Sequence, residues 1–291
     1  MDKAACSGWL ILDKPQGLQC TKLVGQIKRM FGTKKAGHAG TLDPFATGLL
    51  PVALGEATKI MPYIAGSDKR YAFTMRFGYE TDTLDCDGQI TAQSDERPSL
   101  AAIEAILPHF LGRISQIPPK YSAVHIDGKR AYDLARKGED FTMPAREVVI
   151  HDLTVQDHPD RDHMILMVHC GTGTYVRSLA RDIAYYAGAY TTLSALRRTT
   201  FGQLQENDAI SLGKLEKKAH KGAQSSMLQP TGYVLDGIPV CQVSCSQCAL
   251  IRQGRGIRIE DCQVSPAMKP RDQQIVAIYK EADLLAMAKG N

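Results

Sequence analysis

The segment GHAGTLDPFATG, residues 37–48, is the most informative part of this chain because it places one carboxylate, Asp43, among three glycines and a proline. Glycine permits backbone angles closed to other residues, and Pro44 fixes the turn directly after Asp43. A rigid loop that presents a single acid is typical of a catalytic site. The same residue types also suit a surface turn in which the aspartate caps a helix.

The composition is that of a folded protein with a mild positive charge. The chain has 291 residues, is 44% hydrophobic and carries a formal net charge of +4. This length predicts one large domain and a small second one. The basic residues form two clusters: Lys22, Lys28, Arg29, Lys34 and Lys35, and then Arg177, Arg181, Arg197 and Arg198. Such clusters fit a nucleic-acid surface or a solvated basic face.

The sequence gives no sign of a membrane protein. No apolar run approaches the length of a membrane span, and residues 1–8 contain no apolar core of signal-peptide length. We therefore expect a soluble, cytoplasmic protein. Four of the eight cysteines, Cys6, Cys20, Cys86 and Cys170, are scattered singly and are interpreted as reduced structural thiols.

Hydrophobic periodicity predicts a mixture of helices and strands. The expected elements of the first half are a strand at 9–12, a turn at 13–17, a helix over 23–31 stopped by Gly32, a buried strand at 49–54, a short helix at 56–64 and a strand at 69–78. In the last of these, Tyr71, Phe73, Met75 and Phe77 alternate with smaller or polar residues. One face of that strand should therefore be apolar and aromatic.

The second half is predicted to contain a helix over 99–111 capped by Ser99, an irregular polar stretch at 118–146, strands at 148–155 and 164–170, and a helix from about 175 to 187. Arg177 and Arg181 are four residues apart and share a face of this last helix.

Two segments resemble ligand loops but do not meet their requirements. The acidic stretch 80–88 would place Thr83 and Ser94 at the first and twelfth positions of a calcium loop, and the twelfth requires a bidentate glutamate. The segment Gly171-Thr172-Gly173-Thr174 precedes a helix, as a phosphate cradle does. It lacks both the Walker lysine and the longer dinucleotide fingerprint. We therefore expect no nucleotide cofactor.

Several segments carry a family resemblance. Residues 34–50 resemble the signature of the TruB family of tRNA pseudouridine synthases, which is related to the dyskerin branch. Six other motifs agree with that family in order and spacing, over roughly residues 8–210: Gly8 to Gly17, Lys69-Arg70-Tyr71, residues 81–88, Pro119 to Ala123, Gly173 to Arg177, and Leu196-Arg197-Arg198. Seven motifs in one order are not expected by chance.

The resemblance implies an α+β fold, in which a mixed, largely antiparallel sheet with flanking helices and a central cleft forms a catalytic domain over residues 1–230. It also implies isomerisation of a uridine in the T-loop arm of tRNA, at position 55, after the base is flipped out. The N1–C1′ bond breaks and the sugar rejoins the base through C5. This reaction involves no redox change and no donor group, so no cofactor, metal or nucleotide is needed.

The resemblance assigns the catalytic roles to three residues. Asp43 is the catalytic carboxylate, Arg177 pairs with it, and Tyr71 stacks on the target base and is a candidate for the later proton removal at C5. The first step stays open: the carboxylate attacks the sugar, attacks the base, or removes a sugar proton. From the residues alone, Arg177 also suits a surface helix arginine and Tyr71 a core strand residue. We expect Arg177 within ion-pair reach of Asp43 and Tyr71 facing the same cleft.

Four further residues match positions that hold the substrate in the family. His38 matches the residue that inserts into the stack vacated by the flipped base, although a lone histidine also suits a structural role. Lys59 matches a position beside the catalytic side of the cleft. Tyr175 and Leu196 match positions against the flipped nucleotide.

The stretch at about 124–146 corresponds to an insertion that closes over the RNA in the family. Lys129, Arg130, Arg136, Lys137 and Arg146 give it phosphate-binding potential with little sequence discrimination. We expect it to become ordered when tRNA binds.

Residues 231–291 are predicted to form a small β-rich RNA-binding module of the PUA kind, with short strands and turns at 238–243, 249–258 and 274–288. Cys241, Cys245, Cys248 and Cys262 cluster here, and their spacings of three, two and thirteen intervening residues fit the paired CxxC pattern of zinc sites poorly. Buried thiols are the preferred interpretation, with zinc left as an alternative.

The predicted partner is the T-arm of tRNA, bound by a monomer. A non-catalytic tRNA-binding or tRNA-folding chaperone is the alternative function. A nucleotide hydrolase that uses Asp43 is disfavoured because phosphate and metal motifs are missing.

Overall fold

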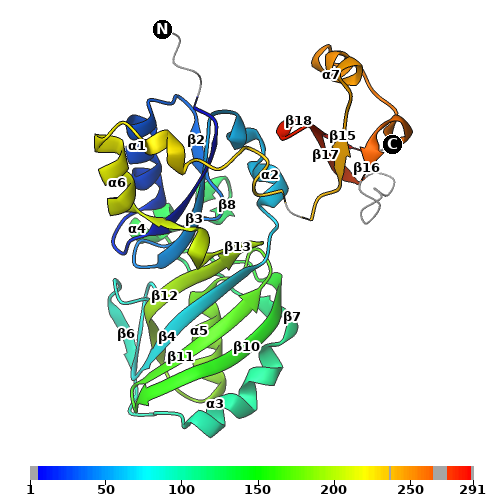
Figure 1. Ribbon diagram of the computed structural model, residues 1–291. Coiled ribbons are helices and arrows are strands. Elements are labelled where there is room, and N and C mark those ends of the chain that lie inside the picture. Colours follow the sequence, from blue (N-terminus) through cyan, green and yellow to red (C-terminus); the bar gives the residue numbers. More distant parts are fainter. Residues whose placement is uncertain (1–5, 236, 265–273, 290–291) are drawn as a thin grey trace.

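The computed structural model describes residues 6–235, 237–264 and 274–289. These residues form a large ten-stranded mixed sheet with helices around it, and a separate four-stranded sheet near the C-terminus (Figure 1). The α+β architecture expected from the sequence is confirmed. In the part of the chain that the structure describes, no helix is both long and apolar enough to cross a membrane.

The large sheet has the strand order β14-β1-β3-β12-β4-β11-β10-β7, with β2 paired to β3 and β13 paired to β12. Its strands are β1 (Gly8–Lys14), β2 (Ala36–His38), β3 (Thr47–Leu54), β4 (Lys69–Phe77), β7 (Gly112–Gln116), β10 (Arg146–Asp160), β11 (His163–Cys170), β12 (Thr191–Phe201), β13 (Leu204–Gln205) and β14 (Ile210–Ser211). Most neighbours are antiparallel, but β1 with β14 and β3 with β12 are parallel.

Helices cover this sheet, and short hairpins extend from it (Figure 1). The helical elements up to residue 227 are α1 (Cys20–Phe31), η1 (Gly55–Lys59), α2 (Met61–Ile64), α3 (Leu100–Ile106), η2 (Leu107–Phe110), α4 (Ala131–Arg136), α5 (Val176–Tyr186), η3 (Glu206–Asp208), α6 (Leu212–His220) and η4 (Gln224–Met227). The hairpins are β5 (Tyr79–Thr81) with β6 (Ile90–Gln93), and β8 (His125–Ile126) with β9 (Lys129–Arg130).

The clearest sequence patterns correspond to elements of the structure. Along β4, Tyr71, Phe73, Met75 and Phe77 are all buried in one core with residues of α1, α3, α5, β11 and β12. The helix α1 ends where Gly32 adopts a left-handed conformation with φ of 61°, as its position after the last apolar residue predicts.

Two predicted helices are shorter or more broken than expected. The segment 56–64 divides into η1 and α2, because Pro62 has no N–H to continue a preceding helix. The segment 99–111 is α-helical only to Ile106, and its last turn contains Pro108 and tightens into the 3₁₀ element η2. Ser99 caps this helix as predicted, since its hydroxyl accepts a hydrogen bond from the Ala102 N–H.

The small sheet has the order β16-β15-β17-β18, formed by β15 (Val240–Gln242), β16 (Gln263–Val264), β17 (Ile275–Lys280) and β18 (Asp283–Lys289). The 3₁₀ element η5 (Ile259–Asp261) precedes β16. The strands and turns predicted at 249–258 are wrong, because α7 (Cys245–Arg252) occupies part of that range. Ser244 starts α7 with a capping box: its hydroxyl accepts from the Gln247 N–H, and Gln247 accepts from the Ser244 N–H.

A glycine is required where β3 and β12 run parallel. Gly48 pairs with Arg198 across these strands and has φ of 98°. A Cβ atom at this position would lie 2.3 Å from the backbone oxygen of Arg198. Neither strand can move away easily, because both lie inside the ten-stranded sheet.

We expect Gly48→Ala to lower the free energy of unfolding by about 3 kcal/mol or more, since it combines a left-handed strain with a backbone clash. Gly188→Ala is the matched control: its φ is 72°, but no atom lies within 4 Å of the added Cβ. It should cost about 1–2 kcal/mol. Urea unfolding measures both, and equal losses in the two variants would contradict the role given to the strand contact.

Candidate active site

Asp43 and Arg177 lie in a pocket of about 270 Å³. Its walls come from the loop between β2 and β3, from β4, from β12 and from the segment that leads into α5. Other residues that line it include Tyr71, Ser122, Arg146, Tyr175, Leu196 and Arg198. The sequence motifs that are far apart along the chain therefore converge on one pocket.

The two charged side chains form a close ion pair. Arg177 Nη2 donates a hydrogen bond of 3.0 Å to Asp43 Oδ1, and its Nε lies 2.9 Å from Oδ2. The Arg177 side chain is only 3% exposed, whereas that of Asp43 is 29% exposed. The guanidinium thus donates a hydrogen bond to one oxygen and forms an ion pair with the other, in a carboxylate that still reaches the open pocket.

A second carboxylate approaches the same guanidinium. Arg177 Nη1 lies 3.5 Å from Asp85 Oδ2 and donates a hydrogen bond to the carbonyl of Thr83. Arg177 Nη2 also donates to the carbonyl of Tyr121. Asp85 is buried, and this burial raises its pKa, with the Thr83 hydroxyl and Arg177 acting in the opposite direction. Arg177 therefore joins the Asp43 loop to two other loops.

The Asp43 loop is also held from below by a buried lysine. Lys14 is fully buried, and its Nζ donates hydrogen bonds to the carbonyls of Pro44 at 3.0 Å and Ala46 at 2.6 Å. Burial lowers the pKa of Lys14, while the negative charge of Asp43 opposes that shift. The backbone that directly follows Asp43 is thereby fixed.

The part of the loop that precedes Asp43 is held by Arg198. This residue is 1% exposed, and its Nη2 donates to the carbonyl of Gly40 while its Nε donates to that of Leu49. Gly40 has φ of 72°, and a Cβ there would lie 2.9 Å from the ring of Phe201. A glycine is therefore needed where the loop passes over Arg198 and Phe201.

Tyr71 forms part of the pocket wall, as expected. Burial raises the pKa of its phenol, which therefore stays protonated at neutral pH, and the nearby charge of Arg198 partly offsets that shift. Tyr175 and Leu196 line the same pocket. The wall facing Asp43 is thus partly aromatic and apolar.

Four of the residues singled out from the sequence do not line this pocket. His38, on β2, is half-buried, and burial followed by the charge of Arg198 lowers its pKa, which favours the neutral imidazole. Lys59 is exposed, forms an ion pair with Glu56 and is not among the residues that line the pocket. Lys59 ends η1, and its side chain turns back along that element. Lys129 and Arg130 are exposed on the β8–β9 hairpin.

Sequence reasoning missed Lys14, Asp85 and Arg198 as parts of the site. Each lies in a motif that was already recognised, respectively residues 8–17, 81–88 and 196–198. The signal for Asp85 was that it lies in an acidic turn that does not match the ligand pattern of a calcium loop. Such an acid has to find another partner when it is buried.

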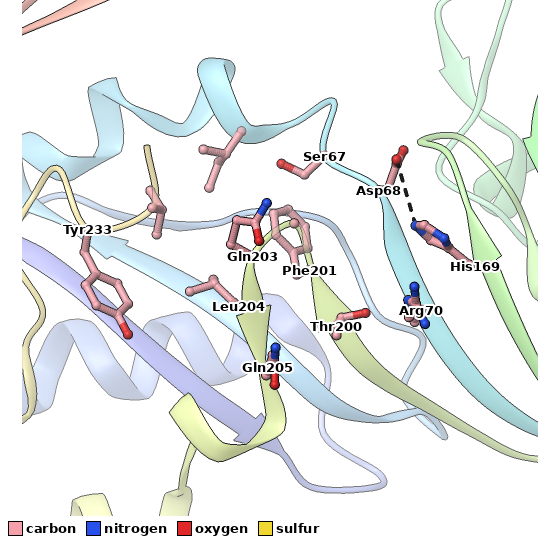
Figure 2. Close-up of a pocket in the computed structure, with 13 residues that line it drawn as sticks. Ser67, Asp68, Arg70, His169, Thr200, Phe201, Gln203, Leu204, Gln205 and Tyr233 are labelled. Carbon is pink, nitrogen blue, oxygen red and sulfur yellow. Dashed lines mark ion pairs between the residues drawn. The ribbon is translucent and has the colours of Figure 1, made fainter. Parts of the chain in front are cut away.

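A larger hollow of about 790 Å³ lies elsewhere, between the ends of β4, β11, β12 and β13 and the segment around Tyr233 (Figure 2). Arg70, Asp68 and His169 are on its wall, and neither Asp43 nor Arg177 is. The smaller pocket contains the convergent charged groups, so it is the better candidate for chemistry.

The C-terminal cysteines do not gather as zinc ligands. Cys241 and Cys248 are buried, Cys245 is exposed and Cys262 is half-buried, all as free thiols. Among the described residues, which include these four, no three of their sulfurs lie within 4.8 Å of one another. Cys245 begins α7, whereas Cys241 lies on β15. The buried-thiol interpretation fits this arrangement for Cys241 and Cys248.

Comparison with known proteins shows which family the chain resembles. Residues 28–176 match the model of the TruB family pseudouridylate synthase N-terminal domain. The chain is 46% identical over 277 residues to tRNA pseudouridine synthase B of Caulobacter vibrioides. The aligned residues cover 94% of this chain and 89% of that protein. It is 49% identical over 257 residues to the protein of the same name from Zymomonas mobilis, with 86% of this chain and 84% of that protein covered.

Solved structures share the fold over nearly the whole chain. A Cbf5–Nop10–Gar1 complex contains a chain with a TM-score of 0.74 and 26% identity, covering 97% of this chain and 78% of that one. An H/ACA RNP bound to a substrate RNA containing 2′-deoxyuridine contains a chain with a TM-score of 0.76 and 24% identity, covering 97% of this chain and 77% of that one.

We expect Arg177→Met to lower the free energy of unfolding by about 3–5 kcal/mol, because it leaves Asp85 buried without its cation. Adding Asp85→Asn to that variant should recover part of the loss. Arg181→Met, one turn further along α5, should cost about 1 kcal/mol, because its partner Asp182 remains partly exposed to water. Urea unfolding at pH 7 tests this, and a double variant no more stable than Arg177→Met would contradict it.

Proposed function

Because this chain belongs to the TruB family of pseudouridylate synthases, we propose that it converts a uridine of tRNA to pseudouridine with Asp43 as the catalytic carboxylate. The observation that carries this assignment is the pairing of Asp43 with the buried Arg177 at a partly open pocket. An exposed turn that merely capped a helix would not be held in this way. The proposed substrate is the uridine at position 55, in the T-loop.

The chemistry requires a positioned charge more than any external reagent. The N1–C1′ bond breaks, a C5–C1′ bond forms, C5 loses a proton, and N1 of the rejoined base carries one. Every atom stays within the substrate or is exchanged as a proton. A single carboxylate can start this sequence as nucleophile or base. Arg177, through its hydrogen bond to Oδ1 and its ion pair with Oδ2, fixes the direction in which Asp43 faces the flipped nucleotide.

The flipped uracil is proposed to lie against Tyr71, Tyr175 and Leu196. These side chains give the pocket an aromatic and apolar wall, and stacking of a base on an aromatic ring contributes about 1–3 kcal/mol. The raised pKa of Tyr71 keeps its phenol protonated at neutral pH. Its hydroxyl is therefore a hydrogen-bond donor toward the base during binding.

His38 is proposed to brace the stack that the flipped base leaves. It lies at the end of β2, directly before the Asp43 loop, and so outside the pocket that receives the base. Burial lowers its pKa, so the ring inserts as a neutral group. A neutral, flat ring is suited to stacking between bases.

The RNA is proposed to contact two further regions. The insertion at 124–146 carries exposed Lys129 and Arg130 on its hairpin, where they can reach phosphates. We further propose that residues 231–291 act as a PUA-like RNA-binding module beside a catalytic domain of residues 1–230, and that exposed Lys59 contacts RNA outside the pocket. The protein is proposed to act as a monomer in the cytoplasm.

The assignment is tested with unmodified tRNA transcript. Asp43→Asn should abolish pseudouridine formation, detected by nuclease digestion and mass analysis, while tRNA affinity stays within a few-fold because phosphate contacts supply most of the binding. Asp87→Asn, which changes an exposed acid, should retain turnover. Turnover by Asp43→Asn would remove Asp43 from its role. Binding without any product from the intact protein would instead support the chaperone alternative.

The role of the insertion is tested by salt dependence. In the Lys129→Ala/Arg130→Ala double variant, the slope of log K against log salt for tRNA should fall in magnitude by up to about 2, since two phosphate contacts are lost. Arg161→Ala is the control, because Arg161 lies in the turn between β10 and β11, away from the hairpin (Figure 1). An unchanged slope in the double variant would exclude these two contacts.

A further inference from the structure

Three side chains whose donor atoms suit a metal ion lie close together, away from the pocket that holds the catalytic carboxylate. Asp68 precedes β4, His169 lies near the end of β11, and His151 lies on β10. Asp68 Oδ2 is 3.3 Å from His151 Nε2 and 3.9 Å from His169 Nε2. Figure 2 shows Asp68 and His169 facing each other at the edge of the larger hollow. The sequence had not singled out any of the three.

A β-bulge contributes to this arrangement. Ile150 pairs with Cys170, but the next pair is Asp152 with His169, so β10 has one extra residue here. His151 and Asp152 are both exposed opposite His169, whereas Ile150 and Leu153 on either side are buried. Bulges commonly redirect side chains in this way. The rings of His151 and His169 lie side by side with centroids 4.7 Å apart.

We propose that Asp68, His151 and His169 bind a divalent transition-metal ion of the zinc type. Bonds of 2.0–2.1 Å in a tetrahedral arrangement separate ligand atoms by about 3.3 Å. The three donor atoms all lie within 4.8 Å of one another and therefore need only small side-chain rotations. Two imidazoles and a carboxylate are ligands that zinc accepts, and three protein ligands leave a fourth position for water.

The surroundings of the three ligands allow a cation to enter. Asp68 and His151 are exposed and His169 is half-buried, so the ion has a direct path from solvent. Arg70, which pairs with His169 across β4 and β11, brings a positive charge. The carboxylates of Asp68 and Asp152 offset that charge. The backbone of Asp68 is fixed, since its carbonyl accepts a hydrogen bond of 2.8 Å from the Gly202 N–H.

The test is a titration of the full-length, reduced protein with Zn²⁺ by isothermal titration calorimetry. Asp68→Asn, His151→Asn and His169→Asn should each weaken one binding event by about tenfold or more, because each removes a ligand. His163→Asn is the matched control: His163 is also on β11 and lies 2.9 Å from Asp160, but the described part of the chain provides no third metal-ligating group beside this pair. It should bind zinc as the unaltered protein does.

Cysteine thiolates can also ligate zinc, and the chain has eight cysteines, so a second measurement identifies the site. Addition of Co²⁺ should shift the imidazole NMR signals of His151 and His169 and leave that of His163 in place. Unfolding in urea checks that the variants remain folded. Zinc binding that is identical in the unaltered protein and Asp68→Asn, or cobalt shifts that miss both histidines, would overturn the proposal. Neither result depends on the proposed catalytic function.

Discussion

The buried guanidinium of Arg177 is the interaction on which the geometry of this site depends. A charge that is 3% exposed has lost its hydration and is stable only with several partners. Arg177 finds them on three separate loops: the carboxylate of Asp43, the carbonyl of Thr83 with the carboxylate of Asp85, and the carbonyl of Tyr121. Because no one loop satisfies the charge, all three must dock on the first turn of α5 together. The position of the reactive carboxylate is therefore a consequence of folding.

Two more buried cations give the Asp43 loop its rigidity. This loop has no ladder of backbone hydrogen bonds along most of its length, so its carbonyls need other donors. Lys14 supplies them to Pro44 and Ala46, and Arg198 supplies one to Gly40. Both cations also place positive charge near a site that must hold an ionised carboxylate. The same side chains thus donate hydrogen bonds to the loop carbonyls and set the electrostatic environment of Asp43. Both are in place before substrate binds, so the site is preorganised for catalysis.

Local patterns predicted the parts of the fold that are decided locally. The alternation in β4 and the glycine stop of α1 depend on residues a few positions apart, and both are as expected. Lys14 binds the distant carbonyls of Pro44 and Ala46, and Asp85 faces the distant Arg177. The burial of these two charges therefore cannot be read from their neighbours in the sequence. The sequence predicts Lys14 in the turn at 13–17, where a lysine is ordinarily exposed. The helix α7 was missed for a different reason: its start is set by the Ser244–Gln247 capping box, whereas its weakly patterned apolar residues suggested turns.

Because successive side chains of β4 point to opposite faces of the sheet, neighbouring residues of this strand face the catalytic pocket and the proposed metal site. Lys69 and Tyr71 face the catalytic pocket, whereas Arg70 between them faces the opposite side of the sheet, where His169 lies. A metal ion on Asp68, His151 and His169 would have no contact with the uridine, and it would supply no group to the isomerisation. It would instead tie the start of β4 to β10 and β11, immediately before the residues that form the pocket wall. The ion would therefore affect catalysis by making the start of β4 more rigid. It would change the affinity for the flipped base more than the reactivity of Asp43.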